Sequence, residues 1–171
     1  MSLVFTENEL KEIASTFLKE NYEISLKIPV IRNNRLRSTL GRYVINNKGE
    51  PLRIELSGTL LTYGAKETII GVLNHECIHY AFHKQGKPMH DGNPLFERAL
   101  AKHKAPSTKT LKVGKFYTYY CERCKKPGES RLKRLVTHCD DYRTKCCRAK
   151  IILTGEKIIL TGEKIYNGIN S

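Results

Sequence analysis

Apolar residues near the start of the chain recur at helical spacing. Thr6 and Glu9 form a T-x-x-E capping box immediately before this periodic stretch. The apolar residues that share one face of a 3.6-residue period are Leu10, Ile13, Ala14, Phe17 and Leu18. The pattern predicts an amphipathic helix that begins after Thr6 and ends near Asn21.

The next apolar positions follow the two-residue period of strands. Residues 26–30 read as a strand that runs into Pro29, and residues 40–45 and 52–56 flank a turn at residues 46–49. Ile54 and Leu56 alternate with charged residues. We therefore expect a hairpin within a small antiparallel sheet.

The longest apolar run, residues 68–82, has the length of a helix. It should begin between Gly64 and Lys66 and end near Lys84, before the breakers Gly86 and Pro88. Pro94, a residue favoured in the first turn, should begin a further short helix. Helices following a small sheet predict an α+β domain.

Inside the long apolar run lies an H-E-x-x-H sequence, formed by His75, Glu76 and His79. On a helix, four residues advance about 400°, so the two histidines project side by side one turn apart. Two such imidazoles form half of a zinc site, and Glu76 is placed to act as general base on an activated water. The residues between, Cys77 and Ile78, should face the core.

Two simpler explanations compete with this interpretation. A chance match has an expected count of about 0.02 in a chain of this composition, so coincidence is a weak competitor. The histidines of a buried helix could also bond only to backbone or carboxylate groups. Such a helix would have no need for a glutamate between them.

A catalytic zinc ion needs a third protein ligand. His83 is a poor candidate because two turns separate it from His75, about 11 to 12 Å along the axis. The loop at residues 87–93 returns toward the helix and carries His90, our preferred third ligand. Asp91 is the second candidate, and His90 as a plain surface residue is the remaining possibility.

The six cysteines bear on both compartment and chemistry. The chain has no run of about 18 apolar residues, and its first 17 residues lack the pattern of a secretion signal. We therefore expect a cytoplasmic protein without a membrane partner, whose thiols stay reduced. Five of the six cysteines fall in the last third, which favours metal binding over disulfides.

The net charge of +13 is unevenly distributed. Residues 1–100 carry 13 Lys and Arg against 11 Asp and Glu, whereas residues 101–171 carry 17 against 6. A concentrated basic segment predicts a polyanion partner, most simply DNA bound without sequence specificity; the alternative is a merely solvated basic face. The expected contacts are Lys125, Lys126, Arg131, Lys133, Arg134, Arg143, Lys145 and Arg148.

The cysteines lie among these basic residues in a pattern that predicts a structural zinc site. Cys121 and Cys124 form a C-x-x-C knuckle, whereas Cys146 and Cys147 are adjacent and Thr144 stands where a second C-x-x-C would begin. We expect Cys121, Cys124 and Cys147 as ligands, completed by Cys139, His138 or Cys146; loss of the metal is the alternative. Tyrosines that could stack on bases or fill a small core are Tyr117, Tyr119, Tyr120 and Tyr142.

The chain ends with a repeated heptad, residues 151–157 and 158–164. Glycine in each Thr-Gly-Glu predicts turns between short strands rather than a coiled coil. Together these features predict a metallopeptidase-like domain at residues 1–104, a linker at 105–115, and a basic zinc-ribbon-like module at 116–171.

The order of these elements resembles the SprT-like family, whose eukaryotic relative Spartan is a zinc metalloprotease that acts on proteins crosslinked to DNA. The resemblance rests on the Leu-Gly-Arg-Tyr and Ile-Glu-Leu-Ser strands, the H-E-C-I-H helix, the Gly-Lys-Pro loop, Phe96 and the Cys-containing basic tail, and covers about residues 5–150. It implies a zincin-like fold with a zinc ribbon, His75, His79 and His90 as zinc ligands, and Glu76 as base. The loop departs from the family pattern, in which a histidine stands closer to the phenylalanine than His90 does to Phe96.

The function predicted is peptide hydrolysis by zinc-activated water, on or near DNA-bound proteins, with one catalytic and one structural zinc ion. The rival is a non-catalytic nucleic-acid-binding zinc protein with a structural H-E-x-x-H site. A metal-dependent hydrolase of a non-peptide substrate would use the same ligands.

Overall fold

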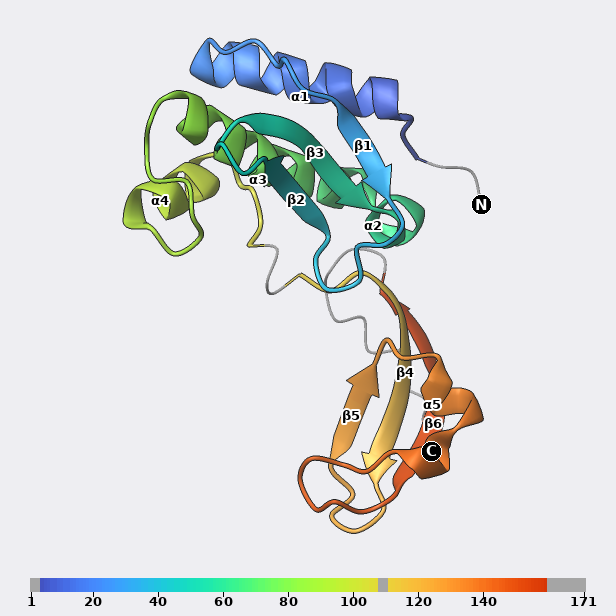
Figure 1. Cartoon of the computed structure of the whole chain (residues 1–171). Helices are drawn as coiled ribbons and strands as arrows, with labels where there is room; N and C mark the ends of the chain where they lie inside the picture. Colours follow the sequence, from blue (N-terminus) through green and yellow to red (C-terminus); the bar gives the residue numbers. More distant parts are fainter. Residues whose placement is uncertain (1–3, 108–110, 160–171) are drawn as a thin grey trace. The chain divides into compact units, whose positions relative to one another are not determined.

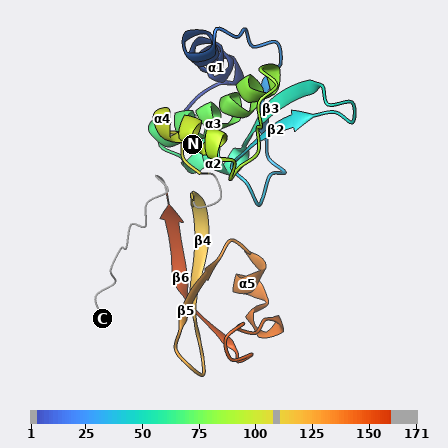
Figure 2. The same ribbon diagram turned by 90° about the vertical axis from the view of Figure 1, so that its left-hand side faces the viewer.

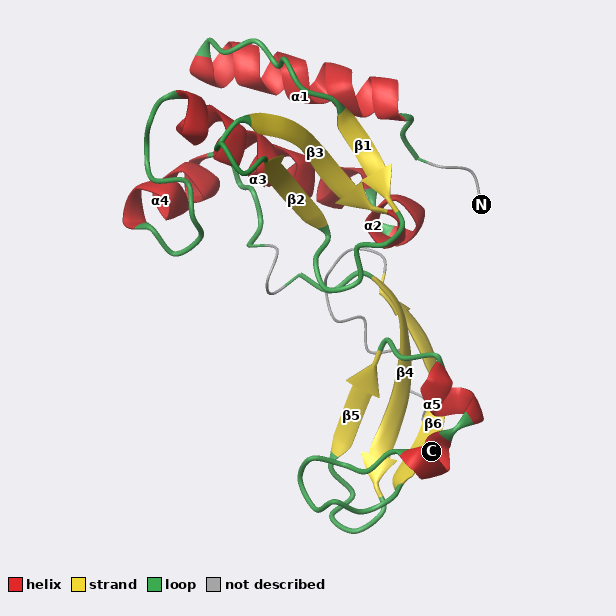
Figure 3. Cartoon of the chain, in the orientation of Figure 1, coloured by secondary structure: helices red, strands yellow, loops and turns green. Residues whose placement is uncertain are grey.

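The computed structural model describes residues 4–107 and 111–159, and the chain forms two compact units. The first unit runs through Val113 and the second begins at Gly114 (Figure 1). Ala105 and Val113, which lie within the predicted linker, are both buried in cores of the first unit. Figure 3 shows that the longer helices belong to the first unit, whereas strands dominate the second.

Helix α1 spans Glu7–Tyr22 and begins with the predicted capping box. The Thr6 hydroxyl accepts a hydrogen bond from the Glu9 backbone N–H, and the Glu9 carboxylate accepts one from the Thr6 N–H. Leu10, Ala14 and Leu18 are fully buried in the core of the unit. The apolar period therefore predicted this helix and its inward face correctly.

The sheet of the first unit contains β1 (Val30–Asn33), β2 (Gly41–Ile45) and β3 (Pro51–Ser57), in the order β1-β3-β2. β2 and β3 form the predicted antiparallel hairpin, but β1 pairs with β3 in parallel, so the expected antiparallel sheet is a mixed one. The expected strand at residues 26–30 is also wrong, because the ladder begins only at Val30. Pro29 has no N–H to donate and contributes only its carbonyl, which accepts from the Ile54 N–H.

Three further helices follow in the first unit: α2 (Gly58–Tyr63), α3 (Lys66–Lys84) and α4 (Pro94–Lys102). The predicted bounds of α3 and the start of α4 are confirmed. The short helix α2 was not expected; its signal is Ser57, whose hydroxyl accepts from the Leu60 N–H as an N-cap.

Helix α3 is buried on more than one side, which explains why its sequence is an apolar run rather than a stripe. Ile69, Val72 and Leu73 belong to the main core with α1 and the sheet. Ile78 and Phe82 pack with Phe96 and Leu100 of α4 in a second cluster. Packing on both sides fixes the helix that carries the H-E-x-x-H residues.

The second unit is a three-stranded antiparallel sheet of β4 (Gly114–Cys121), β5 (Pro127–Ser130) and β6 (Ile151–Ile159), in the order β5-β4-β6 (Figure 1). Figure 2 shows β4 and β6 of this sheet side by side. The short helices α5 (Arg134–Thr137) and η1 (Cys139–Asp141) lie in the connection between β5 and β6. None of the helices in the described ranges is long and apolar enough to cross a membrane.

The first copy of the repeated heptad lies within one continuous strand, β6, so the turn predicted at its Thr-Gly-Glu is wrong. Gly155 adopts a φ of 151° where the register shifts, with Thr118 opposite Gly155 and Tyr119 opposite Leu153. The glycine therefore permits a bulge rather than a turn. Most of the second copy lies outside the described residues.

Candidate metal centres

Both histidines of the H-E-x-x-H sequence are oriented by backbone carbonyls. The Nδ1 of His75 lies 2.8 Å from the carbonyl of Pro106, and the Nδ1 of His79 is hydrogen-bonded to the carbonyl of Met89. A carbonyl can only accept, so each Nδ1 carries a proton, and in the neutral form of each ring Nε2 keeps its lone pair free. This is the tautomer that a metal-ligating imidazole requires.

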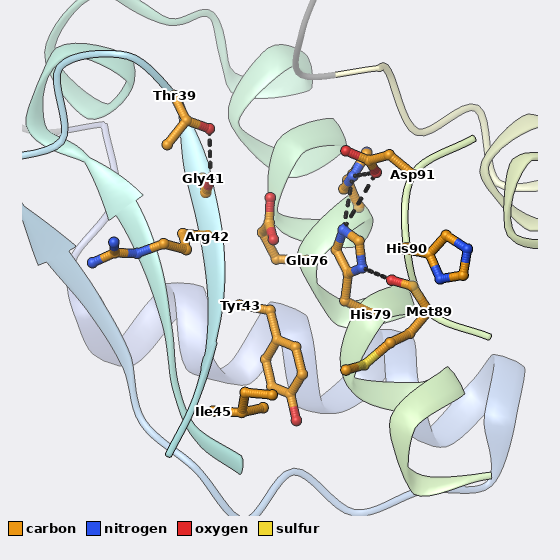
Figure 4. Close-up of a pocket in the computed structure, with 11 residues that line it drawn as sticks. Thr39, Gly41, Arg42, Tyr43, Ile45, Glu76, His79, Met89, His90 and Asp91 are labelled. Carbon is orange, nitrogen blue, oxygen red and sulfur yellow. Dashed lines mark hydrogen bonds and ion pairs between the residues drawn. The ribbon is translucent and has the colours of Figure 1, made fainter. Parts of the chain in front are cut away.

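The two Nε2 atoms and one carboxylate oxygen converge. The Nε2 atoms lie 3.1 Å apart, and Asp91 Oδ1 lies 3.2 Å from that of His75 and 3.6 Å from that of His79 (Figure 4). When both rings are neutral, three acceptors face one another without a hydrogen between them, an arrangement that a cation stabilises. Ligands about 2.1 Å from a tetrahedral zinc ion lie about 3.4 Å apart, so this donor set fits zinc.

The structure brings Asp91, not His90, into this group. His90 is exposed, and its ring points away from Glu76 (Figure 4). The loop is held by Glu97, whose carboxylate accepts from the Gly92 N–H, and by Asn93, which caps α4. These contacts place the sequence-predicted loop at the histidines, but with its neighbouring residue as the third donor.

Phe96 fixes the imidazole planes from the side of α4. Its ring is stacked on His79, with centroids 4.4 Å apart and planes inclined by 27°, and meets His75 edge-on at 5.7 Å. His83 points elsewhere, since its Nδ1 lies 2.7 Å from the Tyr43 hydroxyl. The sequence indicated His83 as an unsuitable ligand, and the structure places it outside the group.

Glu76 lies beside the histidines with only 3 % of its surface exposed. Burial raises the pKa of its carboxyl to about 8; the nearby Asp91 carboxylate adds to this rise, and a hydrogen bond from the Tyr43 backbone opposes it. Burial, with the charge of His75, lowers the pKa of His79 to about 4. Near neutral pH, His79 is therefore uncharged, which is the state in which an imidazole can bind a metal ion.

A cavity of about 400 Å³ opens at these groups. One wall is the loop at residues 89–91, and the other is β2, an edge strand of the sheet. The β2 residues that line it are Gly41, Arg42, Tyr43 and Ile45. Sequence reasoning missed the role of β2 and of the Pro106 and Met89 carbonyls, because a backbone contact leaves no residue-type signal.

In the second unit, four thiols form another candidate metal group. The Sγ atoms of Cys121, Cys124, Cys146 and Cys147 all lie within 4.8 Å of one another. Cys139, one of the alternatives for the fourth ligand, instead bonds through its Sγ to the Ile151 carbonyl at 2.9 Å. His138 bonds to Thr137.

Hydrogen bonds prepare one of these thiols for a metal. The pKa of Cys121 is lowered to about 6 by hydrogen bonds from the Cys124 backbone and the Thr144 hydroxyl. The neighbouring thiols act in the opposite sense on Cys147, raising its pKa to about 12. A divalent cation would remove this conflict by stabilising all four thiolates.

All eight predicted basic contacts are exposed on the second unit. Among the tyrosines, Tyr117 is buried and fills the core, which leaves Tyr119, Tyr120 and Tyr142 partly exposed. A cavity of about 640 Å³ is lined by Tyr119 and Tyr142 together with Lys126, Arg143 and Lys145. Aromatic and cationic side chains therefore share one hollow in this unit.

The first unit is thus a mixed α+β domain in which paired imidazoles and a loop carboxylate can hold a metal ion.

The SprT-like family model matches residues 7–112. The protein "Protein SprT-like" of Bacillus subtilis is 30 % identical over 146 residues, which cover 82 % of this chain and 90 % of that protein. Proteins of the same name from Bacillus velezensis and Lysinibacillus sphaericus are 31 % and 29 % identical, covering 70 % and 85 % of this chain and 78 % and 96 % of theirs. The chain belongs to the SprT-like family.

Proposed function

We propose that the chain is a zinc metallopeptidase of the zincin type, with His75, His79 and Asp91 as the protein ligands. The observation that carries this proposal is the convergence of three acceptor atoms, two of them on imidazoles whose Nδ1 protons are bound by carbonyls. Three protein ligands leave one tetrahedral position open, as in catalytic zinc sites. His90, our preferred third ligand from the sequence, is replaced by Asp91 in this proposal.

A zinc ion held there would supply Lewis-acid polarisation of a scissile carbonyl and would make a water molecule more acidic. A cation beside Glu76 would offset the burial that raises its pKa, so that its carboxylate would take a proton from water in the site and deliver it to the leaving amine. Its carboxylate is held in place by the Tyr43 backbone and shielded from solvent. This shielding keeps the proton in the site between the two steps.

The substrate would bind along the edge of β2 that does not pair with β3. Among the residues that the structure describes, β2 pairs with β3 alone, and its other edge borders the cavity. An extended peptide placed along this edge would add a strand to the sheet and bring a carbonyl to the metal group. Backbone pairing of this kind selects for an unfolded segment rather than for a side-chain sequence.

The test is hydrolysis of an unfolded protein by the zinc-loaded chain and by Glu76→Gln. We expect the variant to keep its zinc and its thermal stability and to lose about 10²- to 10⁴-fold in rate. Full activity in Glu76→Gln would remove this residue from the mechanism. Absence of hydrolysis in the wild-type chain, with zinc bound, would favour the rival in which the H-E-x-x-H site is structural.

DNA binding by the second unit is the accompanying proposal. The observation that favours it is the exposure of eight basic side chains on the second unit. Three of them, Lys126, Arg143 and Lys145, line one hollow together with Tyr119 and Tyr142. Exposed cations contact phosphates, and tyrosine rings stack on unpaired bases. The protein would then cleave proteins that lie on or near DNA, with cysteine-bound zinc holding the second unit together.

A further inference from the structure

The cysteine-bearing turns of the second unit repeat one pattern of backbone hydrogen bonds. In the first turn, the Lys125 N–H donates to the Cys121 carbonyl at 2.9 Å, and the Cys121 N–H donates to the Lys126 carbonyl at 3.0 Å. Lys125 has a positive φ of 61°. Both the backbone N–H and the backbone carbonyl of Cys121 are therefore hydrogen-bonded within this turn.

The second turn makes the same bonds 23 positions later along the chain. The Arg148 N–H donates to the Thr144 carbonyl at 2.9 Å, and the Thr144 N–H donates to the Ala149 carbonyl at 2.9 Å. Arg148 also has a positive φ, 50°. Thr144 is thus the counterpart of Cys121, and Cys147 is the counterpart of Cys124.

The Thr144 side chain lies where this equivalence places the missing thiol. It is buried, and its Oγ1 lies 3.3 Å from the Sγ of Cys121. Ligands about 2.3 Å from a tetrahedral zinc ion are about 3.8 Å apart, so this position is close to a ligand position. A neutral hydroxyl is nevertheless a poor ligand for zinc compared with a thiolate.

Another cysteine supplies the absent sulfur. The Sγ of Cys146, in the second turn, lies 3.5 Å from the Sγ of Cys124, in the first turn. Cys146 is two residues after Thr144 and stands outside the repeated pattern. Adjacent residues of one turn, Cys146 and Cys147, therefore both reach the same group.

We propose that the second turn has exchanged its first ligand, with Cys146 in place of residue 144. The zinc ligands are then Cys121, Cys124, Cys146 and Cys147. The Thr144 hydroxyl donates a hydrogen bond to the Cys121 thiolate. This assignment rests on the cysteine group holding zinc and is independent of the peptidase activity. It implies that a thiol at position 144 can replace the one at position 146.

The experiment uses full-length chains loaded with cobalt or zinc. Thiolate-to-cobalt charge-transfer absorption reports only the cysteine site, and zinc protection from alkylation identifies the ligands by mass spectrometry. We expect wild-type and Cys139→Ser chains to show the absorption, and Cys146→Ser to lose most of it. Zinc should protect Cys146 from alkylation.

The decisive variant is Thr144→Cys combined with Cys146→Ser, which should regain the absorption and the protection. Regain also shows that the loss in Cys146→Ser is not general unfolding. Retention of the wild-type spectrum in Cys146→Ser would overturn the ligand assignment, and failure of the double variant would overturn the equivalence of the turns. No thiolate absorption in the wild-type chain would reject the cysteine site itself, whatever the result of the peptidase assay.

Discussion

Gly41 of β2 lies directly against the carboxylate of Glu76. A Cβ atom at position 41 would come within 2.8 Å of Glu76 Oε1 and 2.9 Å of Val72 Cγ1. Both distances are shorter than a carbon atom tolerates without displacement of its neighbour. Residue 41 therefore has to lack a side chain if Glu76 is to keep its position.

We expect Gly41→Ala to lower the rate of peptide hydrolysis by about 10²-fold, because displacement of a catalytic group by an ångström has an effect of this size. The zinc content should stay unchanged, since Glu76 is not among the converging ligand atoms. Hydrolysis rate and zinc content measured on the same preparation test this. Wild-type activity in Gly41→Ala would mean that the carboxylate can move without consequence.

The third ligand is tested by a matched pair of alanine variants from one loop. Asp91→Ala removes an oxygen that lies 3.2 Å from His75 Nε2, whereas His90→Ala removes an exposed ring. Loss of the carboxylate should weaken zinc binding by at least about 10-fold, whereas the histidine variant should bind zinc as the wild type does. Chelator competition measures both affinities. Greater weakening in His90→Ala would restore the ligand set predicted from the sequence.

The sequence was most informative where a side chain carries the signal. The capping box, the period of α1 and the H-E-x-x-H spacing predicted both helices and the pairing of His75 with His79. The choice between His90 and Asp91 depends on which way a loop turns its side chains, and no periodicity records that. The parallel pairing of β1 was also unpredictable, because short strands of either direction share the same alternation.

A second limit is visible in the cysteine turns. The sequence left Cys139, His138 and Cys146 as alternatives for the fourth ligand. The side chains of adjacent residues such as Cys146 and Cys147 ordinarily diverge, so their binding to one ion could not be assumed. The turn closed by the Arg148 N–H on the Thr144 carbonyl nevertheless brings both sulfurs to one group. Backbone conformation, which residue identity specifies only weakly here, decided which cysteine lies with the others.

Relative to Glu76→Gln, the metal-free wild-type chain should become less stable between about pH 6.5 and 8; the opposite contribution of Cys121, whose pKa is lowered to about 6, is common to both chains. Glu76, with its pKa raised from 4.5 to about 8, binds a proton more tightly when folded, so its contribution is present below about 4.5 and lost as the pH rises to 8. His79, with its pKa lowered from 6.5 to about 4, has the opposite effect, but only below 6.5. Above this pH the fall is at most about 1.4 kcal/mol per pH unit. Urea unfolding of chelator-treated wild-type and Glu76→Gln chains across this pH range measures the difference between them.

Binding of the full chain to single-stranded and duplex DNA should weaken steeply with salt. On a duplex, log K should fall by about 0.9 per phosphate contacted for each unit of log salt, and by about 0.7 on a single strand. The double variant Lys133→Glu with Arg134→Glu should lower both the affinity and this slope, because both side chains are exposed on the second unit.

Its matched control is Lys11→Glu with Lys19→Glu, which makes the same change in net charge on the exposed side of α1. Equal loss in the two double variants would mean that net charge alone attracts DNA, whereas loss confined to the second unit locates the binding surface there. Salt-independent binding would reject a phosphate-based interface altogether.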